Sequence, residues 1–376
     1  MLMVPRNVLG CLVLLTGMMT LPQPVSAQDD PVILERKVSE WIEMLRNDKS
    51  ARKRQGAVLA LSRYGATEKA VLPVMRKALQ EDSSPLVRER IVTAFASLMG
   101  DAGRLVAEDL IRTLKQDQDA NVRLRTAKAL GVQPEAFPDA PPVLLERLGD
   151  PDARVRAACA EAIWRYDSAA AKAKEPLLKL TADMDATVRA SAALALGRII
   201  VESEAVVPTL ARLAGNDPEL AVRMEAVRSL GFWKESARGA SPELLRALND
   251  SAVSLRQEAM LSLGKIVPMS PDAVLAVMER MRTDTDSSVK VFGVRTLSNL
   301  TQRDPAKMVP FLTERLDKET NGDLRLAIID ELRSFGAAAK LAIPSLQSAR
   351  RDAQTVVREA AAQAIQAIEK PAPKQP

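Results

Sequence analysis

Apolar residues recur along this chain with the spacing of one face of a helix, and the same segment returns every 33 to 35 residues. Each copy contains an anchor residue, often with a small residue four positions later, and always a large apolar residue eight positions later. Positions 0, 4 and 8 share one side of an α-helix, so each copy predicts an amphipathic helix that begins just before its anchor. The anchors are Lys53 (a degenerate first copy), Val87, Val122, Val155, Val188, Val222, Leu255, Val289, Leu324 and Val357.

A second apolar stretch, such as residues 143–148, precedes the anchor and predicts another helix in the same copy. A proline commonly opens this stretch, where the first-turn N–H groups have no helical acceptor. Several second helices also reach a glycine, such as Gly197 or Gly231, which is typical of a left-handed C-cap. Two short helices cannot bury their apolar faces alone, so neighbouring copies must stack. We therefore predict an all-α fold, an α-α superhelix of about ten two-helix repeats, over residues 28–369.

The two ends of the chain differ from the repeats. Arg6 is followed by an apolar stretch that is too short to span a bilayer, and then by the small residues Val25, Ser26 and Ala27. This order predicts a removable signal peptide over residues 1–27, and hence an exported protein that is periplasmic or secreted, with no membrane span. Residues 370–376 are rich in proline and predict a short disordered tail.

The composition removes many kinds of catalytic site. The chain has no histidine, and Cys159 is the only cysteine after residue 27. Ser-His-Asp and Cys-His catalysis and histidine-ligated metals are therefore excluded, and we interpret Cys159 as a small buried hydrophobe. The formal net charge of +5 over 376 residues is too small to indicate nucleic-acid binding. We predict no enzymatic activity, no cofactor and no metal site.

An acidic residue five positions before the anchor and a basic residue one position after it recur in every copy. An arginine in the first turn of a helix faces the positive end of the helix dipole and therefore needs a compensating partner. That partner is an acidic residue either of the same copy or of the next one. We interpret these pairs as a structural ladder instead of a catalytic row. The best-formed members are Asp150, Arg156, Asp183, Arg189, Asp217, Arg223, Asp250 and Arg256.

The pattern Asp-x4-Val-Arg-x2-Ala-x2-Ala-Leu-Gly, seen over residues 183–197 and in close form over 217–231, resembles HEAT repeats. The unit length of about 34 residues is similar to the short variety named after phycobilisome lyases. The resemblance covers residues 30–368 and implies a curved solenoid whose second helices line the concave surface.

Basic residues lie on the second helices at positions that face away from the apolar stripe. Either they form a basic stripe that suits an acidic partner, or they belong to a solvated face of mixed charge, since acidic residues share it. Trp164 and Trp233 lie at the ends of second helices, where they either anchor a partner or fill gaps beside alanine-rich helices. The candidate stripe is Lys128, Arg165, Arg198, Arg228, Lys265 and Arg295.

The resemblance implies a protein-binding scaffold, and we expect a non-enzymatic one that is exported and recognises a protein or an extended peptide. One alternative is a lyase or hydroxylase-like HEAT-repeat enzyme. It is disfavoured because the iron site of deoxyhypusine hydroxylase uses histidine and nothing here marks a pigment site. The other alternative is a structural array that self-associates through its ends.

Overall fold

The computed structural model describes residues 32–33, 35–64, 69–98, 100–199, 201–266 and 271–370. The predicted signal peptide and the tail beyond Lys370 lie outside these residues. The described residues are nearly all helical (77%), which confirms the predicted all-α class.

Ten consecutive helix pairs within the described residues confirm the predicted repeat, and short helical segments connect some of them. The first five pairs are α1 (Val38–Asn47) with α2 (Ala51–Leu61), α3 (Val71–Glu81) with α4 (Pro85–Ala96), α6 (Ala107–Gln116) with α7 (Ala120–Val132), α8 (Pro141–Arg147) with α9 (Ala153–Ile163), and α10 (Ala170–Leu180) with α11 (Ala186–Leu196). The other five are α12 (Ser203–Asn216) with α13 (Leu220–Trp233), α14 (Ser241–Ala247) with α15 (Val253–Leu263), α16 (Pro271–Thr283) with α17 (Ser287–Leu300), α18 (Pro305–Lys318) with α19 (Gly322–Ser334), and α20 (Ile343–Ala349) with α21 (Thr355–Glu369). The connecting segments are α5 (Asp101–Arg104) and the 3₁₀ helices η1 (Asp167–Ala169), η2 (Lys234–Ala240) and η3 (Gly336–Ala342).

Helix α11 shows how the repeat sequence forms its second helix. The Asp185 carboxylate accepts hydrogen bonds from the N–H groups of Thr187 (2.7 Å) and Val188 (3.2 Å), which caps the first turn. Alanine, the residue with the highest helix propensity, fills much of the helix. Val188, Ala192 and Leu196, at positions 0, 4 and 8, are fully buried, so the predicted apolar stripe is the packed face.

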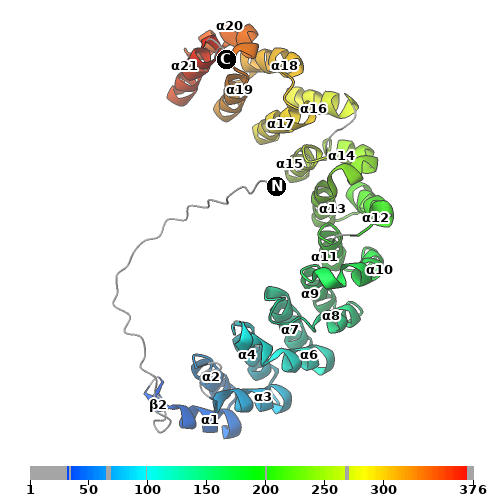
Figure 1. Cartoon of the computed structure of the whole chain (residues 1–376), viewed down its shortest axis with the longest axis vertical. Helices are drawn as coiled ribbons and strands as arrows, with labels where there is room; N and C mark the ends of the chain where they lie inside the picture. Colours follow the sequence, from blue (N-terminus) through cyan, green and yellow to red (C-terminus); the bar gives the residue numbers. More distant parts are fainter. Residues whose placement is uncertain are drawn as a thin grey trace, which may run out of the picture.

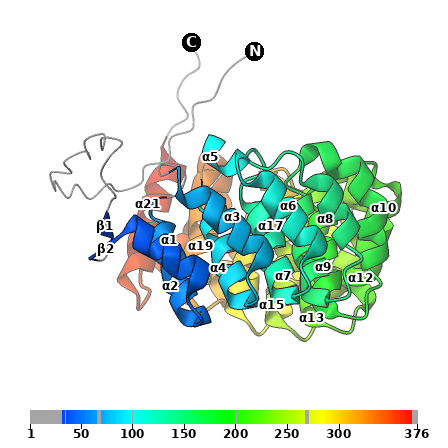
Figure 2. The ribbon, with the colours of Figure 1, turned by 90° about the horizontal axis from the view of Figure 1, so that it is seen from below.

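The pairs stack into a C-shaped arc with the second helices on the inner side and the first helices on the outer side (Figure 1). Seen edge-on, the arc has little pitch, because the terminal units lie at similar heights on one side of the view (Figure 2). One core of buried residues runs from Val38 in α1 to Ile368 in α21. Each unit therefore buries its apolar face against its neighbours, as the repeat period requires.

The glycines at the ends of second helices correct one expectation. Gly197 has a right-handed backbone (φ −72°), and Gly231 lies inside α13, so neither forms a left-handed cap. Both are instead points of close approach between successive second helices. A Cβ atom on Gly197 would lie 2.9 Å from the Cα of Ser229, and one on Gly231 would lie 3.2 Å from the Cα of Ser262.

The chain also departs from the predicted pattern at two kinds of site. Val32–Ile33 and Arg36–Lys37 form a short antiparallel pair before α1, the first described helix, which begins at Val38. Three prolines do not open their first helices as the sequence predicted. The helices α10, α12 and α18 begin several residues before Pro176, Pro208 and Pro310, so these prolines lie inside them.

Candidate binding surface

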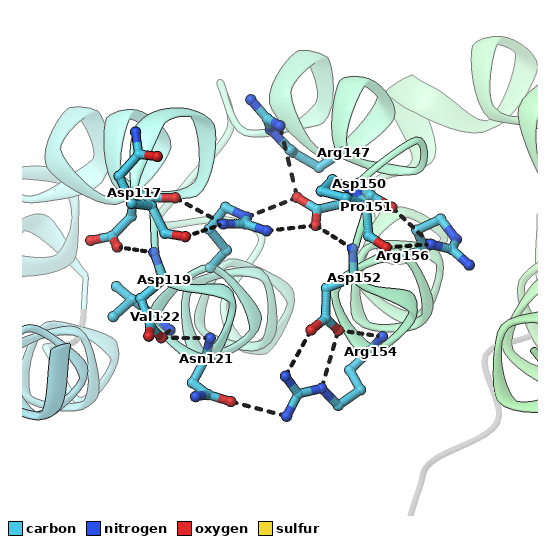
Figure 3. A network of polar contacts seen from close by, with 12 residues as sticks. Asp117, Asp119, Asn121, Val122, Arg147, Asp150, Pro151, Asp152, Arg154 and Arg156 are labelled. Carbon is cyan, nitrogen blue, oxygen red and sulfur yellow. Dashed lines mark hydrogen bonds and ion pairs between the residues drawn. The ribbon is translucent and has the colours of Figure 1, made fainter.

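The acidic and basic residues of the repeat form an inter-unit ladder on one rim of the arc. Arg123 of α7 donates Nε and Nη2 to the two carboxylate oxygens of Asp150, both at 2.8 Å. The same guanidinium donates Nη1 to the backbone carbonyl of Asp117 in its own unit, at 2.9 Å. Asp150 also accepts the N–H of Asp152 at 3.0 Å (Figure 3). One arginine thus links the turns of two successive units.

The ladder answers the question that the sequence left open, because each side-chain pair joins a basic residue to the acidic residue of the next unit. The contact within a single unit is made to a backbone carbonyl instead. Arg189, for example, donates Nη1 to the carbonyl of Asp183 at 2.9 Å. The nine rungs seen within the described residues are Arg54–Asp82, Arg88–Asp117, Arg123–Asp150, Arg156–Asp183, Arg189–Asp217, Arg223–Asp250, Arg256–Asp284, Lys290–Glu319 and Arg325–Asp352.

The rungs are not equal. Most join two nitrogens to two oxygens, but Arg223 reaches Asp250 with a single Nη2 contact of 3.3 Å. The Nε of Arg223 is buried and has no hydrogen-bond partner among the described residues. A hollow of about 250 Å³ opens beside this rung, between α12 and α14. The ladder is therefore loosest between the sixth and seventh units.

The electrostatics of the ladder favour charged side chains. The hydrogen bond to Asp150 raises the pKa of Arg123. Burial alone would raise the pKa of Asp183 and Asp217, but the arginine of the preceding unit and a backbone N–H outweigh it, so both pKa values lie below the ordinary aspartate value. Carboxylates held in this way are poor general acids or bases at neutral pH.

Most of the predicted stripe lies exposed along the concave, second-helix side. Arg228 differs, because its guanidinium is paired with Glu225 (2.8 Å) and Glu258 (3.1 Å) and is only partly exposed. Its charge is therefore compensated inside the chain. The other five make no ion pair within the described part of the chain: Lys128, Arg165, Arg198, Lys265 and Arg295.

Aromatic rings hold three of these cations. The Arg165 guanidinium lies 4.7 Å from the ring centroid of Trp164, and that of Arg198 lies 5.5 Å from the same ring. Arg198 also lies 3.9 Å from the centroid of Phe232, and the Lys265 ammonium lies 5.1 Å from it. Because these residues come from four successive units, the contacts form a continuous line along the ends of the second helices.

The structure gives Trp233 an internal contact. Its indole N–H donates to the Leu196 carbonyl at 3.0 Å, at the end of the preceding second helix. Tyr166 makes the equivalent contact with the Leu130 carbonyl at 2.6 Å. Each side chain thus satisfies an end carbonyl of the preceding unit.

Sequence reasoning missed this set of side-chain donors. Gln133 donates to the Ala96 carbonyl (3.0 Å), and Asn299 donates to the Gly264 carbonyl (3.1 Å). The available signal was a donor-bearing side chain ten or eleven positions after the anchor in four units.

A hollow of about 320 Å³ lies between α7 and α9, beside the line of rings and cations. Gly131, Ala158 and Ala162 supply small apolar lining, and Lys128 and Arg165 supply positive charge. The exposed side chain of Val132 and the carboxylate of Glu161 complete the lining.

Other chemistry has little support among the described residues. They contain no group of three or more His, Cys, Asp or Glu side chains placed to hold a metal ion. Cys159 is fully buried, and its burial raises the pKa of the thiol, which disfavours the nucleophilic thiolate. No helix in the described ranges is long and apolar enough to cross a membrane.

Comparison with known proteins gives a family match but no curated relative. The sequence matches HEAT repeats over residues 38–131, 107–174, 174–238, 217–298 and 276–366. No curated protein matches the chain.

Solved structures show the same architecture at low sequence identity. An engineered protein superposes with a TM-score of 0.55 at 20% identity, covering 89% of this chain and 99% of its own. Kap95p, whose binding induces the switch loops of RanGDP to adopt the GTP-bound conformation, gives a TM-score of 0.61 at 14% identity, covering 88% of this chain and 50% of its own. The Kap95:Nup1 complex gives a TM-score of 0.57 at 13% identity, and the match covers 88% of this chain and 52% of the matched chain. The chain therefore spans about half the length of Kap95, and these likenesses concern the fold alone.

Proposed function

The chain belongs to the HEAT repeat family, and from that premise we propose that it is a non-enzymatic scaffold that binds a protein or an extended peptide on its concave surface. The observation that carries the proposal is the set of exposed basic side chains on the second helices, which have no carboxylate partner within the described residues. Basic side chains that have no carboxylate partner give a concave surface a positive potential, which attracts an acidic partner. The protein-binding Kap95 structures, which share the fold, support the same general use of it.

The ladder supports a structural role for the repeated carboxylates. A catalytic carboxylate needs access to substrate and a pKa suited to proton transfer. The ladder aspartates are instead paired with arginines, and Asp150 and Asp284 are almost completely buried. We assign them to cohesion between units.

The proposal includes two finer points that rest on the sequence. The unit length of 33 to 35 residues supports the short HEAT variety of the phycobilisome-lyase type. The signal-like residues 1–27 support export to the periplasm or beyond. N-terminal sequencing of the protein from a cell fractionation should give Gln28 as the first residue of an exported form. A cytoplasmic product that retains Met1 would contradict export.

Site-specific photo-crosslinking tests the binding surface. A photoreactive amino acid in place of Leu194, which is partly exposed, samples the concave side of α11. One in place of the exposed Lys179 samples the outer helix α10 of the same unit. We expect the inner probe to capture a protein partner in cells, and the outer probe to capture it much less. Equal capture by both probes, or capture only by the outer one, would place the binding surface elsewhere.

A further inference from the structure

Three cations on the concave side are positioned by aromatic rings and make no ion pair with a carboxylate of the described residues. They are Arg165, Arg198 and Lys265, held against Trp164 and Phe232 at 3.9 to 5.5 Å from the ring centroids. We call these five residues the ring-held row. A ring face attracts a cation through its quadrupole but leaves the net charge in place. The row therefore combines fixed positions with positive charge that is free to pair with an external anion.

Two of the other cations near rings, both in the C-terminal part of the chain, differ from those of this row. Arg282 lies 5.0 Å from the Phe311 ring, but it also pairs with Glu314 at 3.3 Å. Arg303 lies 5.8 Å from the Phe335 ring and 3.9 Å from Glu331. Both are compensated within the chain, whereas the cations of the ring-held row have no such carboxylate among the described residues.

A capping contact explains how Arg198 stays available. Basic side chains just beyond a helix end often turn back and donate to the last carbonyls. Here Trp233 occupies the carbonyl of Leu196, at the end of the helix that Arg198 follows. Arg198 remains exposed beside the rings instead.

The shared rings define the spacing of a matching anion. Arg165 and Arg198 lie 4.7 and 5.5 Å from the centroid of the Trp164 ring, so their charges are at most about 10 Å apart. Arg198 and Lys265 lie 3.9 and 5.1 Å from the centroid of the Phe232 ring, so their charges are at most about 9 Å apart. A peptide in the polyproline II conformation advances about 3.1 Å per residue with three residues per turn, so every third side chain faces the same side about 9 Å further on.

We propose that the ring-held row binds an extended acidic peptide segment with carboxylates at positions i, i+3 and i+6. The inference rests on the proposed binding function and adds to it the chemistry and register of the partner. Charge complementarity selects the acidic side chains, and the rings limit the positions that the cations can take. The neighbouring hollow, lined by Gly131, Ala158 and Ala162, accommodates an apolar side chain next to the first carboxylate.

Fluorescence anisotropy with labelled synthetic peptides tests the register. The first peptide has glutamates at i, i+3 and i+6, and the second has the same composition with the three glutamates adjacent. We expect the spaced peptide to bind the full-length protein at least about fivefold more tightly, and both affinities to fall with salt because exposed charges are screened.

Paired variants test the row itself. The double substitution Arg165→Gln and Arg198→Gln should raise the Kd of the spaced peptide about tenfold, since each exposed ion pair contributes modestly. The matched control replaces Arg112 and Lys179, which are exposed on the outer helices α6 and α10 and make no ion pair within the described residues, with glutamine. That control loses the same charge but should keep the Kd within about twofold of the wild type.

A ring substitution separates positioning from charge. Trp164→Leu leaves the net charge unchanged but removes the ring beside Arg165 and Arg198, so the preference for the spaced peptide should fall. Trp164→Phe keeps a ring and should keep most of the preference. Circular dichroism and thermal unfolding check that each variant is folded.

Three outcomes would overturn the proposal. Equal affinity for the spaced and clustered peptides would show general attraction to acidic chains without register. Tighter binding of a single-stranded oligonucleotide, lost in the double variant, would make the row a nucleic-acid surface. No binding of either peptide would reject the acidic segment, and partner capture from the probe at Leu194 would then still support the proposed function. Loss of that capture as well would reject both.

Discussion

Two arginines at opposite ends of α11 have different surroundings. Arg189, in the first turn, is mostly buried and donates to both carboxylate oxygens of Asp217 at 2.8 and 2.9 Å. Arg198, just beyond the last turn and about 14 Å away along the axis, is exposed and rests against the rings of Trp164 and Phe232. The first is a neutralised member of the ladder, and the second makes no ion pair within the described residues.

The helix dipole explains why the two ends are treated differently. A cation in the first turn meets the positive end of the dipole and is stable there only with a close anion, which the next unit supplies. A cation beyond the last turn meets the negative end and needs no carboxylate to be tolerated. The repeat thus uses arginine for cohesion at one rim and leaves it available at the other.

Acidic pH should produce the largest loss of stability, because it protonates the aspartates of several rungs together. The pKa values of Asp183, Asp217 and Asp284 lie below the ordinary value, since arginine and backbone donors outweigh burial. Their stabilisation is fully present above the unfolded pKa of about 4 and is lost as pH falls through the lower folded values. We expect Tm to stay level from pH 7 to 5 and to drop steeply below about pH 4.

The variant Asp217→Asn provides the control for this acid dependence. It should unfold at lower temperature than the wild type at pH 7, and its Tm should change less between pH 5 and pH 3. A wild-type Tm that stays constant down to pH 3 would show that the charged ladder contributes little stability.

Asp150→Ala should give the largest effect of a single substitution in the ladder. Arg123 would lose both side-chain bonds while its side chain remains only 9% exposed. Breaking a buried pair by removing one partner typically costs about 3–5 kcal/mol in the free energy of unfolding. Denaturant titration followed by circular dichroism measures the change.

The control makes the same substitution at an exposed pair. Asp330, at 54% side-chain exposure, contacts Arg333 at 2.9 Å, so Asp330→Ala should change stability by less than about 0.5 kcal/mol. Similar losses for both variants would mean that burial of the Arg123 rung has no special weight.

The loosest rung should respond less than the buried one. Asp250 and Arg223 are each 20% exposed and share one contact of 3.3 Å. Asp250→Ala should therefore reduce the free energy of unfolding by about 1 kcal/mol, near the net contribution of one ordinary hydrogen bond. A loss as large as that of Asp150→Ala would show that rung geometry does not determine the strength of the ladder.

The sequence predicted what repeats within one unit, and it failed where the answer depends on distances between units. The period identified the helix pairs, the buried face and the charged residues of the ladder. It left open which unit partners Arg189, because Asp183 is near in sequence while Asp217 is near in space. Gly197 was misinterpreted as a cap for the same reason, since its close approach to Ser229 appears only after stacking.

The binding surface was predictable only in part. The position of Arg198 away from the apolar stripe indicated exposure, but its two rings come from the preceding and following units. Arg228 has a similar pattern in the sequence, yet Glu225 and Glu258 compensate it. Side-chain partners across units separate these two arginines, and no local pattern records them.

The same substitution at the two ends of α11 gives the sharpest test of the contrast between them. Arg189→Gln would leave Asp217 buried without its bidentate partner and should cost about 2–4 kcal/mol in the free energy of unfolding. Arg198→Gln removes an exposed cation–π contact and should change that free energy by no more than about 0.5–1 kcal/mol. Parallel denaturant titrations at low and high salt provide the comparison, because each variant is an arginine-to-glutamine change on one helix. If Arg198→Gln destabilised the protein as much as Arg189→Gln, the ring contacts would be part of the cohesion between units. Arg198 would then be bound within the fold, and its charge would not be free for a partner.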